Sequence, residues 1–336
     1  MLGVLSASFA LAPLMLALPV GRAVDRVGER SILVVGASVM ILSCLILLAG
    51  RHDIAWLVAG LILAGVGHLL CVTGEQTAVA AMTTGSSDSR FGAYTFATSL
   101  GQAVGPLLMT LGSGSAPSIA PVLTCALAFS SLTFVTSFAL GRRQREVSTR
   151  PGGSASSLLR ERKFRRAVLL SAIVMAAVDI TLVFLPALGR EVGISAAFIG
   201  WVLGARAVAS MAVRTVTGRL VSALGRRAVL TAGILSAAIA FVSVAIWPTP
   251  SVLLIGAIAA GAGLGVCQPI TMSLVADIAP KNQRGTAMSL RLLGNRLSVV
   301  LVPGVMGAVT ASAGASSVLS ATAVLLFIGF AASVRQ

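Results

Sequence analysis

Long apolar segments, separated by short turns that contain glycine, proline or arginine, make up almost the whole chain. Its 336 residues are 57% hydrophobic and only 10% charged, which is too few charged residues for the surface of a soluble protein of this size. A backbone inside a bilayer must satisfy its own hydrogen bonds, so we expect spanning helices; the continuous hydrophobicity argues against a transmembrane barrel. We therefore predict an all-α, polytopic membrane protein with eleven helices, at roughly residues 2–20, 31–50, 54–82, 91–112, 118–140, 165–188, 196–217, 228–247, 251–276, 285–310 and 315–334.

The basic residues are divided unevenly between the two sides of the predicted membrane. If the turn at 21–30 is cytoplasmic, the connections on that side carry 19 of the 25 Lys and Arg residues, and the opposite connections carry only Arg51 and Arg190. This is the positive-inside pattern, so we expect a multi-pass protein of the cell (inner) membrane with its basic loops in the cytoplasm. The net charge of +15 then reflects topology and gives no reason to expect nucleic-acid binding.

Two basic turns are degenerate copies of each other. The decapeptide GRAVDRVGER at 21–30 returns as GRLVSALGRR at 218–227, which is 197 residues later. A second pair of similar segments places Arg90 and Arg284 at equivalent positions, 194 residues apart. Two independent landmarks with nearly the same spacing indicate an internal repeat of half the protein.

The repeat predicts two pseudo-symmetric helical bundles, residues 1–141 and 165–336. Residues 142–164 are expected to form a flexible cytoplasmic linker whose basic clusters lie at the membrane surface. Two apolar segments precede Gly218 in its half, whereas only one precedes Gly21. We therefore expect that the complete protein has one more helix before Met1; an authentic eleven-helix protein is the alternative.

The first basic turn resembles the loop signature of the major facilitator superfamily, Gly-x-x-x-Asp-Arg-x-Gly-Arg-Arg/Lys. The matching positions are Gly21, Asp25, Arg26, Gly28 and Arg30, with Gly218, Gly225 and Arg226 in the second copy. Glu29 replaces a basic residue in the first copy, and the second copy has Ser222 and Ala223 in place of Asp and Arg. The resemblance implies that Asp25 faces the positive N-terminus of a later helix near Gly285 and latches one face of a carrier. A basic loop that only sets topology is the alternative.

Polar and ionisable groups inside the predicted helices are the candidates for a substrate or proton site. Each charge costs roughly 2.5–3.5 kcal/mol at a helix centre, so most should face a bundle interior or an aqueous cavity. Asp179 could pair with Arg206, whereas Arg214 lies nearer the inner surface and is expected to snorkel. Glu75 could instead be a hydrated structural carboxylate, and about half of the arginines could be structural. The candidates are Glu75, Asp179, Arg206, Arg291 and Asn295.

Small residues suggest two places of close helix packing. Gly101, Gly105 and Pro106 have the spacing of a helix-packing motif and resemble the core of the family's antiporter motif. The glycines at 261–265 lie inside an apolar segment, so packing is favoured there over a nucleotide-binding loop. The four cysteines are dispersed in apolar segments without metal-ligand spacing, so we expect no metal and no cofactor.

The resemblance implies a secondary transporter of the major facilitator fold that works by alternating access. We expect proton-coupled efflux of a small organic molecule by a monomer in the lipid bilayer. Uptake of an organic anion is one alternative, because arginines outnumber carboxylates in the helices; a truncated, non-transporting remnant is another. No nucleophile and base pattern suggests an enzyme.

Overall fold

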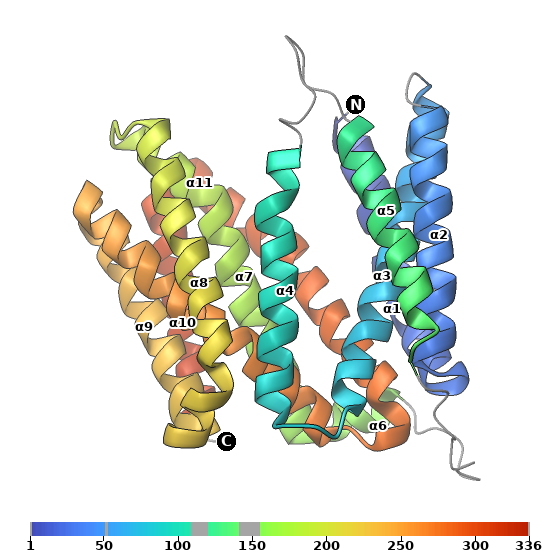
Figure 1. The fold of residues 1–336 in the computed structure, drawn as a ribbon. Helices are drawn as coiled ribbons and strands as arrows, with labels where there is room; N and C mark the ends of the chain where they lie inside the picture. Colours follow the sequence, from blue (N-terminus) through green and yellow to red (C-terminus); the bar gives the residue numbers. More distant parts are fainter. Residues whose placement is uncertain (1, 51–52, 109–119, 141–154, 335–336) are drawn as a thin grey trace. The chain divides into compact units, whose positions relative to one another are not determined.

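The computed structural model describes residues 2–50, 53–108, 120–140 and 155–334, and these are helical with no strand among them (Figure 1). Eight of the described helices have the length and hydropathy to cross a membrane. The helices are α1 (Leu2–Val27), α2 (Glu29–Ala49), α3 (Ile54–Ala81), α4 (Ser87–Leu108), α5 (Ala120–Ser137), α6 (Ala155–Arg160), α7 (Arg162–Glu191), α8 (Ala196–Leu224), α9 (Arg226–Ile246), α10 (Pro250–Ile278), a 3-10 turn (Lys281–Gln283) and α11 (Arg284–Val334).

Each of the eleven predicted segments corresponds to a helix or to part of one, so the all-α prediction is confirmed. The last two segments lie in α11, and the chain bends between them at Gly314, where φ is 77°. The short helix α6 was not expected, because its six residues fall inside the segment predicted to be a flexible linker. Residues 142–154 of that segment lie outside the described part of the chain.

The two basic decapeptides are mainly helix ends, although the sequence suggested turns of ten residues. α1 continues through the first copy to Val27 and α2 begins at Glu29, so only Gly28, with φ 90°, breaks the helix. In the second copy Gly225, with φ 83°, separates α8 from α9 in the same way. Residues with a side chain rarely adopt such φ values, which explains why glycine occupies both positions. Polar residues at the membrane surface do not by themselves end a helix.

The described residues form two compact units, and the first consists of Met1–Met82, Gly101–Leu159 and Ala279–Leu293. Within it α3 packs against α1 and α2, and α2 packs against α5. Its buried core includes Val24 on α1, Ile32 on α2 and Leu69 on α3. The start of α11 belongs to this unit although it comes from the far end of the sequence.

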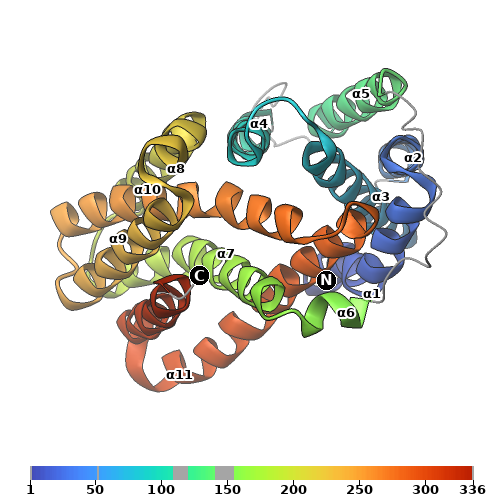
Figure 2. The ribbon, with the colours of Figure 1, turned by 90° about the horizontal axis from the view of Figure 1, so that it is seen from below.

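The second unit consists of Thr83–Leu100, Arg160–Ile278 and Gly294–Gln336. Its centre is α10, which packs against α7, α8 and α9 (Figure 2). The apolar core includes Ile180 on α7, Ile234 on α9 and Ile270 on α10, all fully buried. Each unit therefore combines segments from both halves of the sequence, and the predicted halves at 1–141 and 165–336 stay a prediction based on the repeat.

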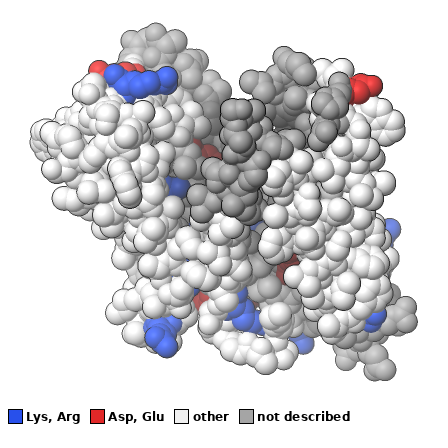
Figure 3. All heavy atoms as spheres, turned by 45° about the horizontal axis from the view of Figure 1, so that its top comes forward, with Lys and Arg blue, Asp and Glu red and all other residues white. Residues whose placement is uncertain are grey.

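Most of the described surface seen in Figure 3 is uncharged, and the Lys, Arg, Asp and Glu side chains visible there lie mainly toward its upper and lower edges. Many large apolar side chains are exposed on the helices, among them Leu169 at 61%, Val208 at 67% and Ile255 at 66%. Such a surface is unfavourable in water and suits the acyl chains of a bilayer. The protein is an integral membrane protein.

Candidate functional site

The Asp25 carboxylate lies at the N-terminus of α11, within the first unit. It accepts hydrogen bonds from the backbone N–H of Gly285 at 2.7 Å, and from the N–H and the hydroxyl of Thr286 at 2.8 and 2.6 Å. The first N–H groups of a helix have no acceptor inside the helix, and the helix dipole makes this end positive. A carboxylate is therefore the acceptor best suited to this position. The contact is where the family resemblance implied; its role as a latch stays a prediction.

Close backbone packing brings each basic turn to the start of another helix. A Cβ added at Gly21 would lie 2.8 Å from the carbonyl oxygen of Gly285 at the start of α11. In the second unit, a Cβ added at Gly218 would lie 2.7 Å from the Cβ of Ser89 at the start of α4. The glycines of the signature thus allow the same close approach in both copies. Arg26 is exposed, and the guanidinium of Arg30 lies over the ring of Phe138, 5.3 Å from its centroid.

The second copy makes its ionic contacts through Arg226. Its guanidinium bonds the Asp88 carboxylate at 2.8 and 3.0 Å and the Asp277 carboxylate at 2.8 Å. The side chain of Asp88 is only 3% exposed, and its other oxygen accepts a hydrogen bond from Ser273. Asp88 and Asp277 lie in or next to the segments whose Arg90 and Arg284 mark the repeat, but the sequence did not predict that either acid would bind Arg226. A usable signal was present, since the second copy has lost both acids of the first (Asp25 and Glu29) and would need carboxylates from elsewhere.

Asp179 on α7 lies near two arginines in the second unit. Its Oδ2 atom is buried and has no hydrogen-bond partner among the described residues, and the same holds for Nε of Arg206. Arg206 on α8 and Arg296 on α11 are both close enough to interact with the Asp179 charge. The expected ion pair between Asp179 and Arg206 is not formed within 4 Å among the described residues. A half-buried acid near two cations, with one buried oxygen left unbonded, is a candidate for binding a proton or a ligand.

Packing between α8 and α10 places Arg206. A Cβ added at Gly261 would collide with the backbone oxygen of Arg206, and one added at Gly265 would lie 2.7 Å from the Ser210 hydroxyl. Gly263 faces α9, and a Cβ added there would collide in the same way with the carbonyl oxygen of Gly233. These contacts confirm that the glycines at 261–265 serve helix packing.

Arg214 does not snorkel, so that prediction is wrong. It is 8% exposed and donates hydrogen bonds to the carbonyl oxygens of Thr95 and Gly265, at 2.9 and 3.4 Å, and to the side chains of Ser99 and Gln268. The reason is again close packing, because a Cβ at Gly92 of α4 would lie 2.8 Å from the Arg214 oxygen. The approach of α4 covers the guanidinium, and four neutral acceptors replace water.

Arg291 and Asn295 share a helix face but make different contacts. Arg291 is 2% exposed and donates to Oε1 of Gln76 on α3 at 2.9 Å, within the first unit. Asn295 is 7% exposed and accepts a hydrogen bond from Ser171 of α7 at 3.1 Å, within the second unit. Gln76 was missed in the sequence, although an amide in mid-helix next to Glu75 is a polar signal. Glu75 itself is half-buried.

The packing expected at Gly101 and Gly105 is not observed. A Cβ added at either glycine would meet no described atom within 4 Å, so among the described residues neither glycine is in close contact with another helix. The helix continues through Pro106, whose side-chain surroundings lie outside what the structure describes. The resemblance to an antiporter motif therefore rests on the sequence.

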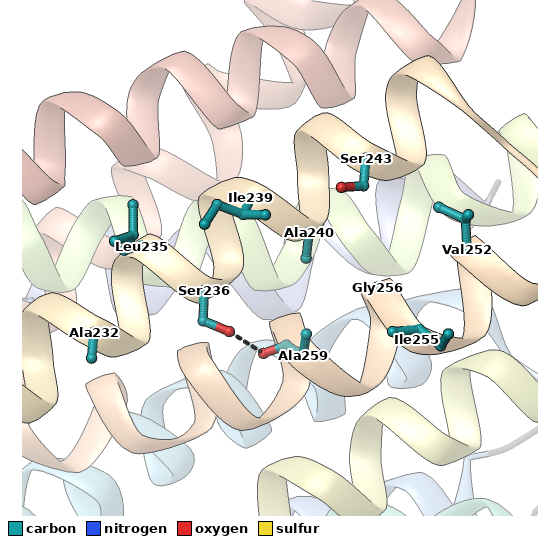
Figure 4. Close-up of a pocket in the computed structure, with 10 residues that line it drawn as sticks. All are labelled: Ala232, Leu235, Ser236, Ile239, Ala240, Ser243, Val252, Ile255, Gly256 and Ala259. Carbon is teal, nitrogen blue, oxygen red and sulfur yellow. Dashed lines mark hydrogen bonds between the residues drawn. The ribbon is translucent and has the colours of Figure 1, made fainter.

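A groove between α9 and α10, of about 560 Å³, is separate from all of these residues (Figure 4). Its lining is apolar apart from Ser236 and Ser243, and the Ser236 hydroxyl donates to the Ala259 carbonyl oxygen. Ile239 and Ile255, which border the groove, are 53% and 66% exposed. With no charged group in its lining, the groove offers nothing for proton binding or ion recognition. No cluster of metal-ligating residues is found in the described ranges.

Comparisons with known proteins show the family and the fold. The family model of the Major Facilitator Superfamily matches residues 1–178 and 167–335. The structure resembles the transporter FucP in the outward conformation (TM-score 0.85, 16% identity, 99% of this chain and 89% of that one). It also resembles the human organic anion transporter MFSD10, with a TM-score of 0.82 and 20% identity over 98% of this chain and 83% of that one. The proton:xylose symporter XylE gives a TM-score of 0.78 and 14% identity over 98% of this chain and 84% of that one. No curated protein matches the sequence.

Proposed function

Because the chain belongs to the major facilitator superfamily, as its family-model match shows, we propose that it is a proton-coupled transporter that exports a small organic molecule. It spans the inner membrane of the cell with both basic turns on the cytoplasmic side, in keeping with the positive-inside pattern of its sequence. The observation that carries the proton-coupled part of the proposal is the buried Oδ2 of Asp179, which has no partner among the described residues.

Asp179 has the environment of a group that changes its protonation during a transport cycle. Its carboxylate lies close to Arg206 and Arg296, so a change in the distance to either arginine would change the balance of charge at this place. Protonation would leave the two arginines uncompensated. Protonation would thus favour an anionic substrate, whereas a cationic substrate would compete with the proton for the carboxylate, which is the requirement of an antiporter.

The contact of Asp25 with α11 supplies the conformational part of the cycle. Alternating access needs contacts that hold one state and break in the other. Three hydrogen bonds from two adjacent residues, all ending on one carboxylate, form a compact contact of this kind. Asp25 is thus the latch in this proposal.

Export is favoured by the sequence Gly101 to Pro106, which resembles the family's antiporter motif. An organic anion is the second candidate for the cargo, and one observation favours it. Around Asp179 the two arginines outnumber the single carboxylate, which leaves a net positive charge for an anionic group to neutralise.

The proposal is tested by proton movement in everted, acid-loaded membrane vesicles. A panel of organic cations and monoanions, such as ethidium and benzoate, is added, and a substrate is a compound that collapses the pH gradient only when the protein is present. We expect Asp179→Asn to abolish this response while membrane insertion is preserved. Asp53→Asn is the matched control, because Asp53 only caps α3 through the Ala55 N–H at 2.8 Å. A normal response in Asp179→Asn would overturn the assignment, and the panel decides between cation and anion.

A further inference from the structure

Arg206, in the middle of α8, is a buried arginine that makes no hydrogen bond through its side chain among the described residues. It is only 8% exposed, and its Nε atom is shielded from solvent with no acceptor in reach. A guanidinium has five N–H donors and keeps its positive charge in proteins. Buried charges are normally paired and hydrogen-bonded, because burial without acceptors is costly. The position of Arg206 therefore calls for an acceptor that its described neighbours do not provide.

Arg214, eight residues further along α8, shows how a buried arginine of this unit is stabilised by the protein itself. It is also 8% exposed, but it donates hydrogen bonds to four neutral oxygens on α4 and α10. Two arginines of the same helix thus have the same exposure and opposite hydrogen-bonding environments. Arg214 is built into the packing of the helices, whereas Arg206 presents its donors to something other than the described residues.

The balance of charge around Arg206 also favours an anion. Asp179 and Arg214 are both close enough to Arg206 to interact with its charge, and Asp179 interacts with Arg296 as well. Among these four groups, all in the second unit, three cations share one carboxylate. The carboxylate forms no ion pair within 4 Å with any of the three in the described ranges. An anion at Arg206 would supply both an acceptor and the missing negative charge.

The surroundings of Arg206 indicate which kind of anion suits it. α10 packs directly on the side chain, since a Cβ added at Gly261 would lie 3.0 Å from the Arg206 Cγ atom. Val202, one turn earlier on α8, belongs to the apolar core and is fully buried. A carboxylate matches the planar fork of a guanidinium with two parallel hydrogen bonds. An organic group attached to it suits apolar neighbours better than the hydration shell of an inorganic ion does.

We propose that Arg206 binds the carboxylate of a small organic monoanion through its guanidinium. The proposal names the contact residue for an anionic cargo, and it rests on the proposed transport function only in identifying this anion with the cargo. Binding itself requires neither transport nor a proton gradient. A failure of the transport proposal and a failure of this one are therefore observed in different experiments.

The test measures binding of benzoate to the purified chain in detergent through its effect on thermal unfolding. A ligand that binds only the folded state raises the melting temperature, and the concentration dependence of the rise gives its Kd. Benzamide is the uncharged analogue of nearly the same shape, and sodium chloride at the same concentration supplies an inorganic anion. We expect benzoate to stabilise the wild type, and neither benzamide nor chloride to do so at that concentration.

Three variants locate the binding site. Arg206→Met keeps the length of the side chain and should weaken benzoate binding about tenfold or more, because the charge-assisted hydrogen bonds are lost. The matched control is Arg190→Gln, which removes an exposed arginine of the same unit and should change the Kd less than about threefold. Asp179→Asn should bind benzoate at least as tightly as the wild type, because it removes a negative charge; its response in vesicles tests transport separately.

The ligand-free melting temperature distinguishes a binding role of Arg206 from a structural one. Arg206→Met should melt no lower than the wild type, because the arginine it replaces has no hydrogen bond among the described residues to lose. If Arg206→Met does not fold, Arg206→Lys keeps the charge without the planar fork and should still weaken benzoate binding.

Four results would overturn the proposal. They are no stabilisation of the wild type by benzoate up to tens of millimolar, equal stabilisation by benzamide or chloride, an unchanged Kd in the Arg206 variants, and an equal loss of binding in Arg190→Gln. A lower ligand-free melting temperature of Arg206→Met with an unchanged Kd would assign Arg206 to the structure instead.

Discussion

Asp25→Asn is the substitution for which the structure gives the clearest expectation. The carboxylate receives three donors from two consecutive residues, Gly285 and Thr286, at 2.6 to 2.8 Å. Both N–H groups lie in the first turn of α11, where the helix supplies no acceptor. An asparagine has one acceptor oxygen, and its amide nitrogen would face a donor. At least one charge-assisted hydrogen bond is therefore lost.

The size of the loss follows from that count. A hydrogen bond to a charged group contributes about 1.5–3 kcal/mol, and the attraction of the charge to the helix dipole adds about 0.3–1 kcal/mol. The lost bond alone would make local opening of the contact about ten- to 150-fold more frequent. Amide hydrogen exchange reports such opening directly, because an amide exchanges when its hydrogen bond is broken.

The assay is hydrogen–deuterium exchange with mass spectrometry on peptides that cover Ala279–Leu293. We expect much faster exchange of the Gly285 and Thr286 amides in Asp25→Asn than in wild type. Asp53→Asn is the control, because its carboxylate caps α3 and does not contact α11. If the exchange of these amides is unchanged in Asp25→Asn, the carboxylate does not hold the start of α11 and the latch assignment fails.

Two other predictions concern the ionic contacts and the packing of the second unit. The effects of Arg226→Gln and Asp88→Asn on the free energy of unfolding should not be additive, because Asp88 is almost fully buried against the guanidinium. A double-mutant cycle measured by thermal unfolding should give a coupling energy of about 0.5–3 kcal/mol. Additive effects would show that the pair is not coupled. Gly263→Ala should destabilise the protein by about 1–3 kcal/mol, because its Cβ has no room between α10 and α9. Gly204→Ala, where a Cβ meets no described atom within 4 Å, is the matched control, and equal melting of the two variants would contradict the packing argument.

The positions of the helices could be predicted because the length of each apolar segment decides them. A segment of about twenty apolar residues has no alternative to a helix in a bilayer, so the length of each run was sufficient. The ends of the helices were harder to predict, because a helix can continue for several residues beyond the end of its apolar segment. α8 runs to Leu224, seven residues beyond the apolar segment predicted to end at 217, and stops only where Gly225 adopts a positive φ.

The environment of a polar group depends on how closely the helices approach, and composition does not reveal that. Arg214 illustrates the difficulty, because its depth along α8 suggested an exposed head group. Its actual surroundings depend on Gly92 and Gly265, two glycines on other helices that let α4 and α10 come within contact distance. The contact of Asp25 was expected only through resemblance to a known family. The partners of Arg226 were not expected at all.

The two basic turns differ in which group supplies the negative charge at their contact with a helix start. In the first, the turn supplies the acid, Asp25, and the helix start supplies donors from its backbone. In the second, the turn supplies the cation, Arg226, and the helix start supplies the acid, Asp88. Asp88 lies in the first turn of α4, where a negative charge is itself favourable. The second copy has therefore exchanged the charges between turn and helix, and its departure from the signature is a change of partner with the close glycine contact retained.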